Sequence, residues 1–202
     1  MRKIFFFSNN KNKISEVTDF FKKTKFNILN LNNFSNIKMP HETGVSFEEN
    51  AKIKSLCGFQ KTNYPCFADD SGFCIRGLKN FPGIKSKRFI EENDGLTNAL
   101  KMILNKTKHL SNNKAFFETS ISFTLNKHTS ITFNGTIDGI ITKELRGNKG
   151  FGYDPIFIPN GHKKTFAEME FKEKNKTSHR SIAIMKFKKY LLNSFDYNSI
   201  SI

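Results

Sequence analysis

The chain of 202 residues has no tryptophan, only three cysteines and no long run of apolar residues. The cysteines, Cys57, Cys66 and Cys74, are odd in number and lack CxxC spacing, so we expect reduced thiols in a cytoplasm. The apolar run near the N-terminus covers only residues 4–7. A secretory signal needs about 7–15 apolar residues and a membrane helix about 20. We therefore expect a cytoplasmic protein that is neither exported nor inserted into a membrane.

Acidic residues are also scarce, with 18 Asp and Glu against 33 Lys and Arg and a formal net charge of +15. Such an excess raises the possibility of a nucleic-acid or membrane partner. The basic residues are scattered along the chain, however, and Lys outnumbers Arg 28 to 5. We interpret the charge as a solvated surface and expect neither partner. The competing hypothesis, an RNA- or DNA-binding module, requires basic and aromatic residues clustered on one face and strongly salt-dependent binding.

The hydrophobic content of 37%, with 23 Phe, is sufficient for a substantial core built largely from Phe and Ile. The length fits one domain, and the sequence contains no internal repeat or linker. We predict one α/β unit with a mixed sheet. Residues 1–193 would form this domain and residues 194–202 a C-terminal tail.

Apolar periodicity and turn residues predict the elements of this unit. Strands are predicted at residues 3–7, 26–31, 66–68 and 73–78, and an antiparallel hairpin at residues 115–125 and 131–141. Helices are predicted after the polar loop of residues 8–13, over residues 47–59 where Ser46 and Glu49 form a capping-box pattern, and over residues 96–104 and 178–192. The glycine-rich residues 146–155 predict a shaped loop.

Asp69 and Asp70 form the densest acidic point, where the predicted strand of residues 66–68 stops at Asp-Asp-Ser-Gly. Hard oxygen ligands at a strand end suit a Mg²⁺ ion that bridges protein and phosphate. Repulsion between neighbouring carboxylates would also be relieved by a cation. The alternative is a solvated turn, for which the same four residues are well suited.

Two basic segments are candidates for phosphate binding. Residues 8–13 lie between a predicted strand and helix, where free backbone N–H groups and the helix dipole favour an anion. Lys13 would add a point charge, although the segment lacks the glycines of a P-loop. Lys54 lies on the capped helix. Each of these lysines could instead simply face solvent.

Two further clusters have both a functional and a structural interpretation. Glu42 precedes the capped helix, where it could complete a metal site or act only as a partner of the helix dipole. Lys174, Ser178, His179 and Arg180 gather at the start of the last predicted helix. They could form a donor-rich pocket for a base carbonyl, or a helix cap with surface neighbours.

Five motifs follow one another in order along the chain. They are Ser8-x-Asn10-x-x-Lys13, Glu42-Thr43-Gly44-x-x-Phe47-x-Glu49-Asn50-Ala51-x-x-Lys54, Ala68-Asp69-Asp70-Ser71-Gly72 with Pro82-Gly83-x-x-Ser86-x-Arg88, Gly150-Phe151-Gly152-Tyr153-Asp154-Pro155-x-Phe157, and Ala167-Glu168-Met169 with Lys174 and Ser178-His179-Arg180. Through these motifs the chain, from Ile4 to about Leu192, resembles the inosine triphosphate pyrophosphatases, which act on non-standard purine triphosphates.

The resemblance implies a two-lobed α/β fold around a long mixed sheet with flanking helices, an active site in the cleft between lobes, and a homodimer. It implies hydrolysis of ITP, dITP and XTP to the monophosphate and pyrophosphate with Mg²⁺. Asp70 would be the catalytic acid/base, and Glu42, Asp69 and Asp70 would organise the metal. The implied substrate-binding residues are Ser8, Asn9, Asn10, Lys11, Asn12, Lys13, Lys54, Ser71, Phe151, Gly152, Tyr153, Asp154, Lys174, His179 and Arg180.

Among these residues, the resemblance implies that Phe151 stacks on the purine, while Asp154, Lys174, His179 and Arg180 read its polar edge. Hypoxanthine and xanthine have a carbonyl acceptor where adenine has an amine, so a pocket of donors would leave adenine mismatched. A related pyrophosphatase acting on modified pyrimidine or methylated nucleotides is the nearest competing hypothesis. The chain departs from the family at residues 79–81, where relatives typically have Gly-Gly-Ala, and at His41, where a carboxylate is common.

Overall fold

The computed structural model describes residues 2–196, which form two compact units. Of the described residues, the first unit contains 2–70, 120–135 and 180–196, and the second contains Ser71–Thr119 and Thr136–His179. The chain therefore passes between the units four times, directly after Asp70, Thr119, Gly135 and His179.

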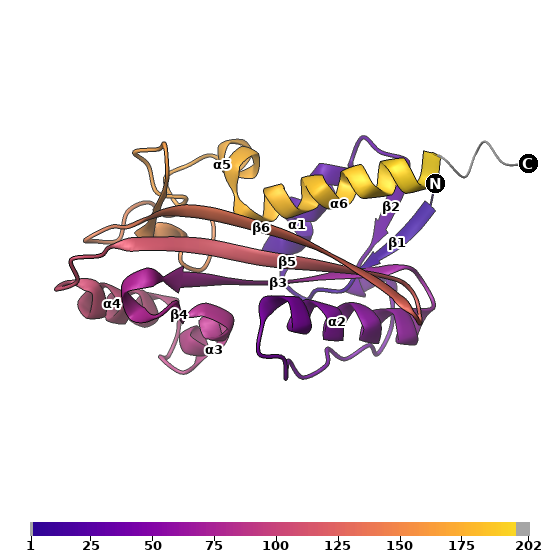
Figure 1. Ribbon diagram of the computed structural model, residues 1–202, viewed down its shortest axis with the longest axis horizontal. Coiled ribbons are helices and arrows are strands. Elements are labelled where there is room, and N and C mark those ends of the chain that lie inside the picture. The colour runs from indigo at the N-terminus through magenta and orange to yellow at the C-terminus, as the bar shows by residue number, and fades with distance from the viewer. Residues whose placement is uncertain (1, 197–202) are drawn as a thin grey trace, which may run out of the picture. The chain divides into compact units, whose positions relative to one another are not determined.

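Seven strands of the described residues form one mixed sheet (Figure 1). They are β1 (Arg2–Phe6), β2 (Phe26–Leu29), β3 (Cys66–Ile75), β4 (Phe81–Pro82), β5 (Lys114–Asn126), β6 (Thr129–Ile141) and β7 (Phe157–Pro159). The order is β2-β1-β3-β5-β6-β7, and β4 pairs with β3. Strand β1 is parallel to β2 and β3, whereas β4 and β7 pair antiparallel with β3 and β6. The predicted α/β class with a mixed sheet is confirmed.

Six α-helices accompany these strands in the described part of the chain. They are α1 (Lys11–Phe21), α2 (Phe47–Thr62), α3 (Ser86–Glu91), α4 (Leu96–Thr107), α5 (Phe171–Thr177) and α6 (His179–Asp196). The predicted tail from residue 194 begins inside α6, and its residues 197–202 lie outside the described residues.

Successive residues of β1 point to opposite sides of the sheet, and in the first unit both sides are buried. Ile4 and Phe6 of β1 pack with residues of α1 and α6, including Val17 and Phe187. Phe5 and Phe7 belong to a separate cluster on the other face, against α2. Figure 1 shows α1 and α6 on one side of β3 and α2 on the other. Burying a side chain of this kind contributes about 1.5–3 kcal/mol.

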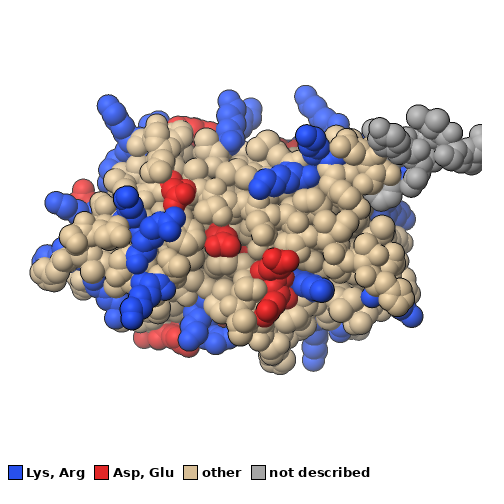
Figure 2. Space-filling model, in the orientation of Figure 1, with Lys and Arg blue, Asp and Glu red and all other residues tan. Residues whose placement is uncertain are grey.

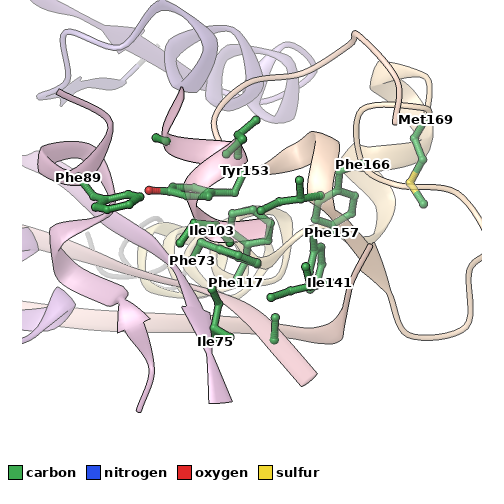
Figure 3. Packing of buried hydrophobic residues seen from close by; sticks show 14 residues of the cluster. Phe73, Ile75, Phe89, Ile103, Phe117, Ile141, Tyr153, Phe157, Phe166 and Met169 are labelled. Carbon is green, nitrogen blue, oxygen red and sulfur yellow. The ribbon is translucent and has the colours of Figure 1, made fainter. Parts of the chain in front are cut away.

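Aromatic rings dominate the core of the second unit (Figure 3). Phe73 stacks on Tyr153 with ring centroids 5.0 Å apart, and Phe117 meets Phe157 edge-on at 4.9 Å. The Tyr153 hydroxyl donates to the Ser86 carbonyl oxygen over 2.9 Å, which satisfies its one polar group inside the core. Phe and Ile are therefore the main core residues here, as predicted.

Two local predictions are corrected. Strand β3 continues through Asp69, Asp70 and Ser71 to Ile75, so the acidic pair lies within a strand and not at its end or in a turn. Helix α1 begins at Lys11, inside the segment predicted as a loop, because the Asn10 side chain accepts from the backbone N–H groups of Asn12 and Lys13 and acts as the N-cap.

Residues 79–81, where the chain departs from the family pattern, include two residues with an unusual backbone conformation. Lys79 and Asn80 have φ of 54° and 64°, a left-handed conformation that glycine adopts without steric cost. The chain therefore makes a glycine-type turn with two residues that carry side chains. His41 is exposed.

Candidate active site

Asp69 and Asp70 are consecutive residues of β3, so their side chains point to opposite faces of the strand. Both are buried, with 3% and 7% of their surface exposed. Asp69 faces α1 and α6, while Asp70 faces α2, as their contacts show. The pair therefore serves two different sets of partners.

Asp69 is held by two cations. Its Oδ2 atom lies 2.9 Å from Nζ of Lys13 and 3.1 Å from Nε of Arg180. Burial raises the pKa of Asp69, but Lys13 and Arg180 outweigh it, so its pKa is held well below the ordinary range. Asp69 thus stays ionised.

Arg180 is a buried ion-pair residue rather than a surface one. Its Nη1 atom lies 2.5 Å from Oε2 of Glu16, and only 2% of the residue is exposed. Burial lowers the pKa of Arg180, but Glu16 and Asp69 outweigh it and raise the pKa. These contacts place Arg180 in the Asp69 network of the first unit, so they favour a positioning role over the predicted contact with the purine edge.

Asp70 is held from the side of α2. Its Oδ1 accepts from Nζ of Lys54 over 3.1 Å, and its Oδ2 accepts from Nδ2 of Asn50 over 3.2 Å. The Asn50 Oδ1 atom in turn accepts from the backbone N–H of Gly44 over 2.8 Å. The loop that carries Glu42 is thereby tied to the side chain that orients Asp70.

Lys54 joins Asp70 to Glu42, whose Oε1 lies 2.6 Å from the same ammonium. Burial lowers the pKa of Lys54, but the carboxylates of Asp70 and Glu42 outweigh it and the pKa is raised. For Asp70 the balance is reversed: burial outweighs the attraction of Lys54, and its pKa is raised. A carboxyl group with a raised pKa is suited to exchanging protons.

The predicted magnesium ligands divide into two groups. Glu42 and Asp70 are hard oxygen donors that converge on one cation, the Lys54 ammonium, so their chemistry and placement fit Mg²⁺. Asp69 fits less well as a direct ligand, because Lys13 and Arg180 both contact its Oδ2. The three carboxylates do not form one metal-binding group among residues 2–196.

The segment before α1 contributes backbone as well as side chains. Ser8 is buried, and its Oγ accepts from the Asn10 backbone N–H over 3.2 Å. Asn9, Lys11 and Asn12 are exposed, so these three predicted binding residues could meet a ligand only at the surface. Lys13 reaches inward, where burial lowers its pKa and the attraction of Asp69 offsets only part of that effect.

In the second unit Asp154 organises the glycine-rich loop. Its buried Oδ2 accepts from the Phe151 backbone N–H over 2.8 Å and lies 2.5 Å from Nζ of Lys174. The Lys174 ammonium lies 4.4 Å from the centroid of the Phe151 ring. Gly150 has φ of 74°, and a Cβ atom there would lie 2.1 Å from Oδ2 of Asp154. Glycine is therefore required for this close approach.

The remaining predicted residues of the second unit have different surroundings. Tyr153 is a core residue whose ring packs on Phe73, so substrate contact through its side chain is not favoured. His179 is buried and stacks on Phe117 with centroids 4.8 Å apart. Ser71 shares a 2.6 Å hydrogen bond with Thr119. Gly152 follows Phe151 with φ of 61°.

Sequence reasoning missed roles for Glu16 and Asn50. Asn50 was part of a recognised motif, but no role followed from its position. Glu16 is a buried carboxylate one helical turn after Lys13, and its salt bridge to Arg180 spans 164 positions in the sequence. An acidic residue three positions from a lysine on an amphipathic helix was the available signal.

Figure 2 shows Lys and Arg spread over the face in view and not gathered into one patch. Within residues 2–196, no helix is both long enough and apolar enough to cross a membrane.

Sequence and structure comparisons relate the chain to one group of known proteins. The chain is 39% identical to a dITP/XTP pyrophosphatase of Borrelia garinii subsp. bavariensis, covering 98% of this chain and 100% of the relative. A protein of the same name from Christiangramia forsetii is 38% identical, covering 94% and 98%. The solved structure of a HAM1 protein from Coxiella burnetii matches with a TM-score of 0.89 and 32% identity, covering 96% and 100%. A sequence model of the Ham1 family matches residues 4–190, and the chain accordingly belongs to the Ham1 family.

Proposed function

We propose that the protein hydrolyses non-standard purine nucleoside triphosphates, ITP, dITP and XTP, to the monophosphate and pyrophosphate. Two relatives, at 39% and 38% identity, carry the name dITP/XTP pyrophosphatase. The observation that carries the proposal is Asp70: a buried carboxyl with a raised pKa, oriented by Asn50 and paired with Lys54. This arrangement supports a role for Asp70 as a general base beside a cation that can bind phosphate.

The first unit binds the triphosphate and supplies the proton acceptor. Lys13 and Lys54 provide positive charge for the phosphate oxygens, and the start of α1 adds the positive end of the helix dipole near Ser8 and Asn10. Asp70 takes a proton from a water molecule while the oxygen of that water bonds to the α-phosphorus. The bond from that phosphorus to the bridging oxygen breaks, and pyrophosphate leaves with its charge held by the two lysines.

Mg²⁺ is part of this proposal, held by Glu42 and Asp70. When bound it neutralises phosphate charge and acts as a Lewis acid. Lys54 contacts both of these carboxylates and supplies positive charge beside them. Asp69 acts through Lys13.

The second unit binds the purine. The ring of Phe151 offers a stacking face, and Lys174 offers N–H donors to the carbonyl at position 6. Adenine has an amine at that position, so its complex would leave donors facing donors, a mismatch that costs about 1–3 kcal/mol. Asp154 fixes both elements of this recognition through its bonds to the Phe151 backbone and Lys174.

A panel of nucleoside triphosphates tests the proposal. Purified protein with Mg²⁺ is given ITP, dITP, XTP, ATP, GTP and modified pyrimidine triphosphates, and pyrophosphate, orthophosphate and monophosphate are measured. Faster pyrophosphate release from ITP, dITP and XTP is expected. Equal rates on ATP and ITP would remove the selectivity, a preference for modified pyrimidines would favour the competing hypothesis, and a diphosphate product would contradict attack at the α-phosphorus.

We further propose, from the resemblance, that the protein acts as a homodimer in the cytoplasm. Sedimentation velocity at micromolar concentration tests the first point, with one species of twice the 23.3 kDa chain mass as the expected result. Cell fractionation tests the second.

A further inference from the structure

A chain of three ion pairs links three elements of the first unit, and one turn of α1 closes it into a ring. It runs from Glu16 on α1 to Arg180 on α6, from Arg180 to Asp69 on β3, and from Asp69 back to Lys13 on α1. The atoms in contact are separated by 2.5, 3.1 and 2.9 Å. The side chains of Glu16, Arg180 and Asp69 are 2–4% exposed and that of Lys13 is 15% exposed. Only Lys13 therefore retains appreciable access to a ligand.

The spacing on α1 explains how the ring closes. Lys13 and Glu16 are three residues apart, so they lie on the same face of the helix, one turn from each other. Arg180 bridges from Glu16 to the same Oδ2 atom of Asp69 that contacts Lys13. Two cations and two anions balance within the ring, which suits charges removed from water.

We infer that Glu16 is a positioning residue for triphosphate binding: it fixes Arg180, Arg180 fixes Asp69, and Asp69 fixes the ammonium of Lys13. The inference rests on the proposed function for the identity of the phosphate ligand. It assigns Arg180 to the phosphate side of recognition, and Glu16 contacts neither substrate nor metal itself.

A positioning role and a simple charge effect predict opposite changes in anion affinity when Glu16 is substituted. Removal of a negative charge near the phosphate subsite strengthens anion binding through Coulomb attraction alone. If Glu16 acts by holding the ring, its removal loosens Lys13 and weakens anion binding. The sign of the change therefore separates the two explanations.

The experiment measures the affinity for inorganic tripolyphosphate, which has no base, by calorimetry and as competitive inhibition of ITP hydrolysis with Mg²⁺. The variants are Glu16→Gln and Glu16→Asp; the second keeps the charge but is one methylene shorter, and protects the test if the first unfolds. Both are expected to bind tripolyphosphate about tenfold more weakly, a change of the size of one charge-assisted hydrogen bond. The ITP-to-ATP ratio of kcat/KM is expected to stay unchanged.

Asp19→Asn is the matched control, because Asp19 lies one turn further along α1 as an exposed carboxylate paired with Lys22. It removes the same charge and should leave the affinity unchanged. A double-mutant cycle with Lys13→Met should show that Glu16→Gln adds no further loss once Lys13 is gone.

Unchanged or tighter tripolyphosphate binding in both folded Glu16 variants would overturn the inference. The inference would also be overturned if the Glu16 variants had wild-type tripolyphosphate affinity but an altered ITP-to-ATP ratio of kcat/KM. Additive losses of affinity in the double-mutant cycle, or a wild type that does not bind tripolyphosphate, would overturn it as well. Failure of the proposed function has a different signature: the wild type would release no pyrophosphate from any nucleotide, while the calorimetric comparison could still be made.

Discussion

The ammonium of Lys174 lies 2.5 Å from Oδ2 of Asp154 and 4.4 Å from the centroid of the Phe151 ring. One cation thus contacts the carboxylate that anchors the loop and the ring assigned to stacking. A base stacked on Phe151 would find its nearest donor already oriented by Asp154.

Lys174→Met should lower the preference for ITP over ATP by about tenfold, because the donor for the 6-carbonyl is lost. The kcat/KM values of both nucleotides measure this effect. Lys172→Met, an exposed lysine on the same helix, is the control and should keep the preference. A Lys174→Met variant with the same preference as the wild type would contradict the assignment of Lys174 to base reading.

Asp70→Asn should reduce kcat by about 10²–10⁴-fold, since the amide cannot accept the proton of the attacking water. In the wild type, kcat/KM should fall as the pH is lowered and Asp70 becomes protonated. Steady-state rates over a pH series and a melting curve test both points. Near-normal turnover in the folded Asp70→Asn variant would exclude Asp70 as the base.

Asp69 should make stability depend on pH in the acid range. Its pKa is lowered on folding, so its stabilising contribution is complete above the unfolded value of about 3.9 and is lost as the pH falls toward the folded value. Asp69→Asn should lower the free energy of unfolding by about 3–5 kcal/mol at neutral pH, because buried Arg180 and partly buried Lys13 both lose a charged partner. Urea unfolding at several pH values should show that the free energy of unfolding depends less on pH in the acid range for this variant. An unchanged dependence on pH would contradict the assignment of this effect to Asp69.

Gly150→Ala should displace Asp154, since the added Cβ would lie 2.1 Å from its Oδ2. We expect a raised KM for ITP and a stability loss of about 1–3 kcal/mol. Gly161→Ala separates backbone strain from the clash, because Gly161 also has positive φ, 81°, but has no atom within 4 Å of an added Cβ. If the two variants have equal KM values, the contact with Asp154 is not what requires glycine.

Glu42→Gln should raise the Mg²⁺ concentration needed for half-maximal activity, by about tenfold, because a charged oxygen donor is lost. Chelation by EDTA should abolish wild-type activity and added Mg²⁺ should restore it. Glu48→Gln, an exposed acid in the first turn of α2, should behave as the wild type. An unaltered metal requirement in Glu42→Gln would remove Glu42 from the metal site.

Local patterns were enough to predict the α/β class and most elements. Helix α2 follows from its Ser46 cap, whose side chain accepts from the Glu49 backbone N–H. The Glu49 carboxylate reaches Val45 instead of Ser46, so only half of the capping box forms. Strands β5 and β6 follow from alternation and the two residues that join them.

The surroundings of Asp69 and Asp70 could not be predicted in the same way. Asp-Asp-Ser-Gly favours a turn locally, but Lys13, Lys54 and Arg180 supply buried partners that keep these residues in a strand. These partners come from helices distant in the sequence. The same distance hid the role of Glu16, since no local pattern connects it to Arg180.

The alternation along β3 has a consequence for how this gene can change. A deletion or insertion of one residue between Cys66 and Ala68 would turn Asp69 and Asp70 to the opposite faces of β3 and separate each carboxylate from its present partners. Single substitutions in this strand leave its register intact, whereas an insertion or deletion changes it. Related chains should therefore align here without gaps.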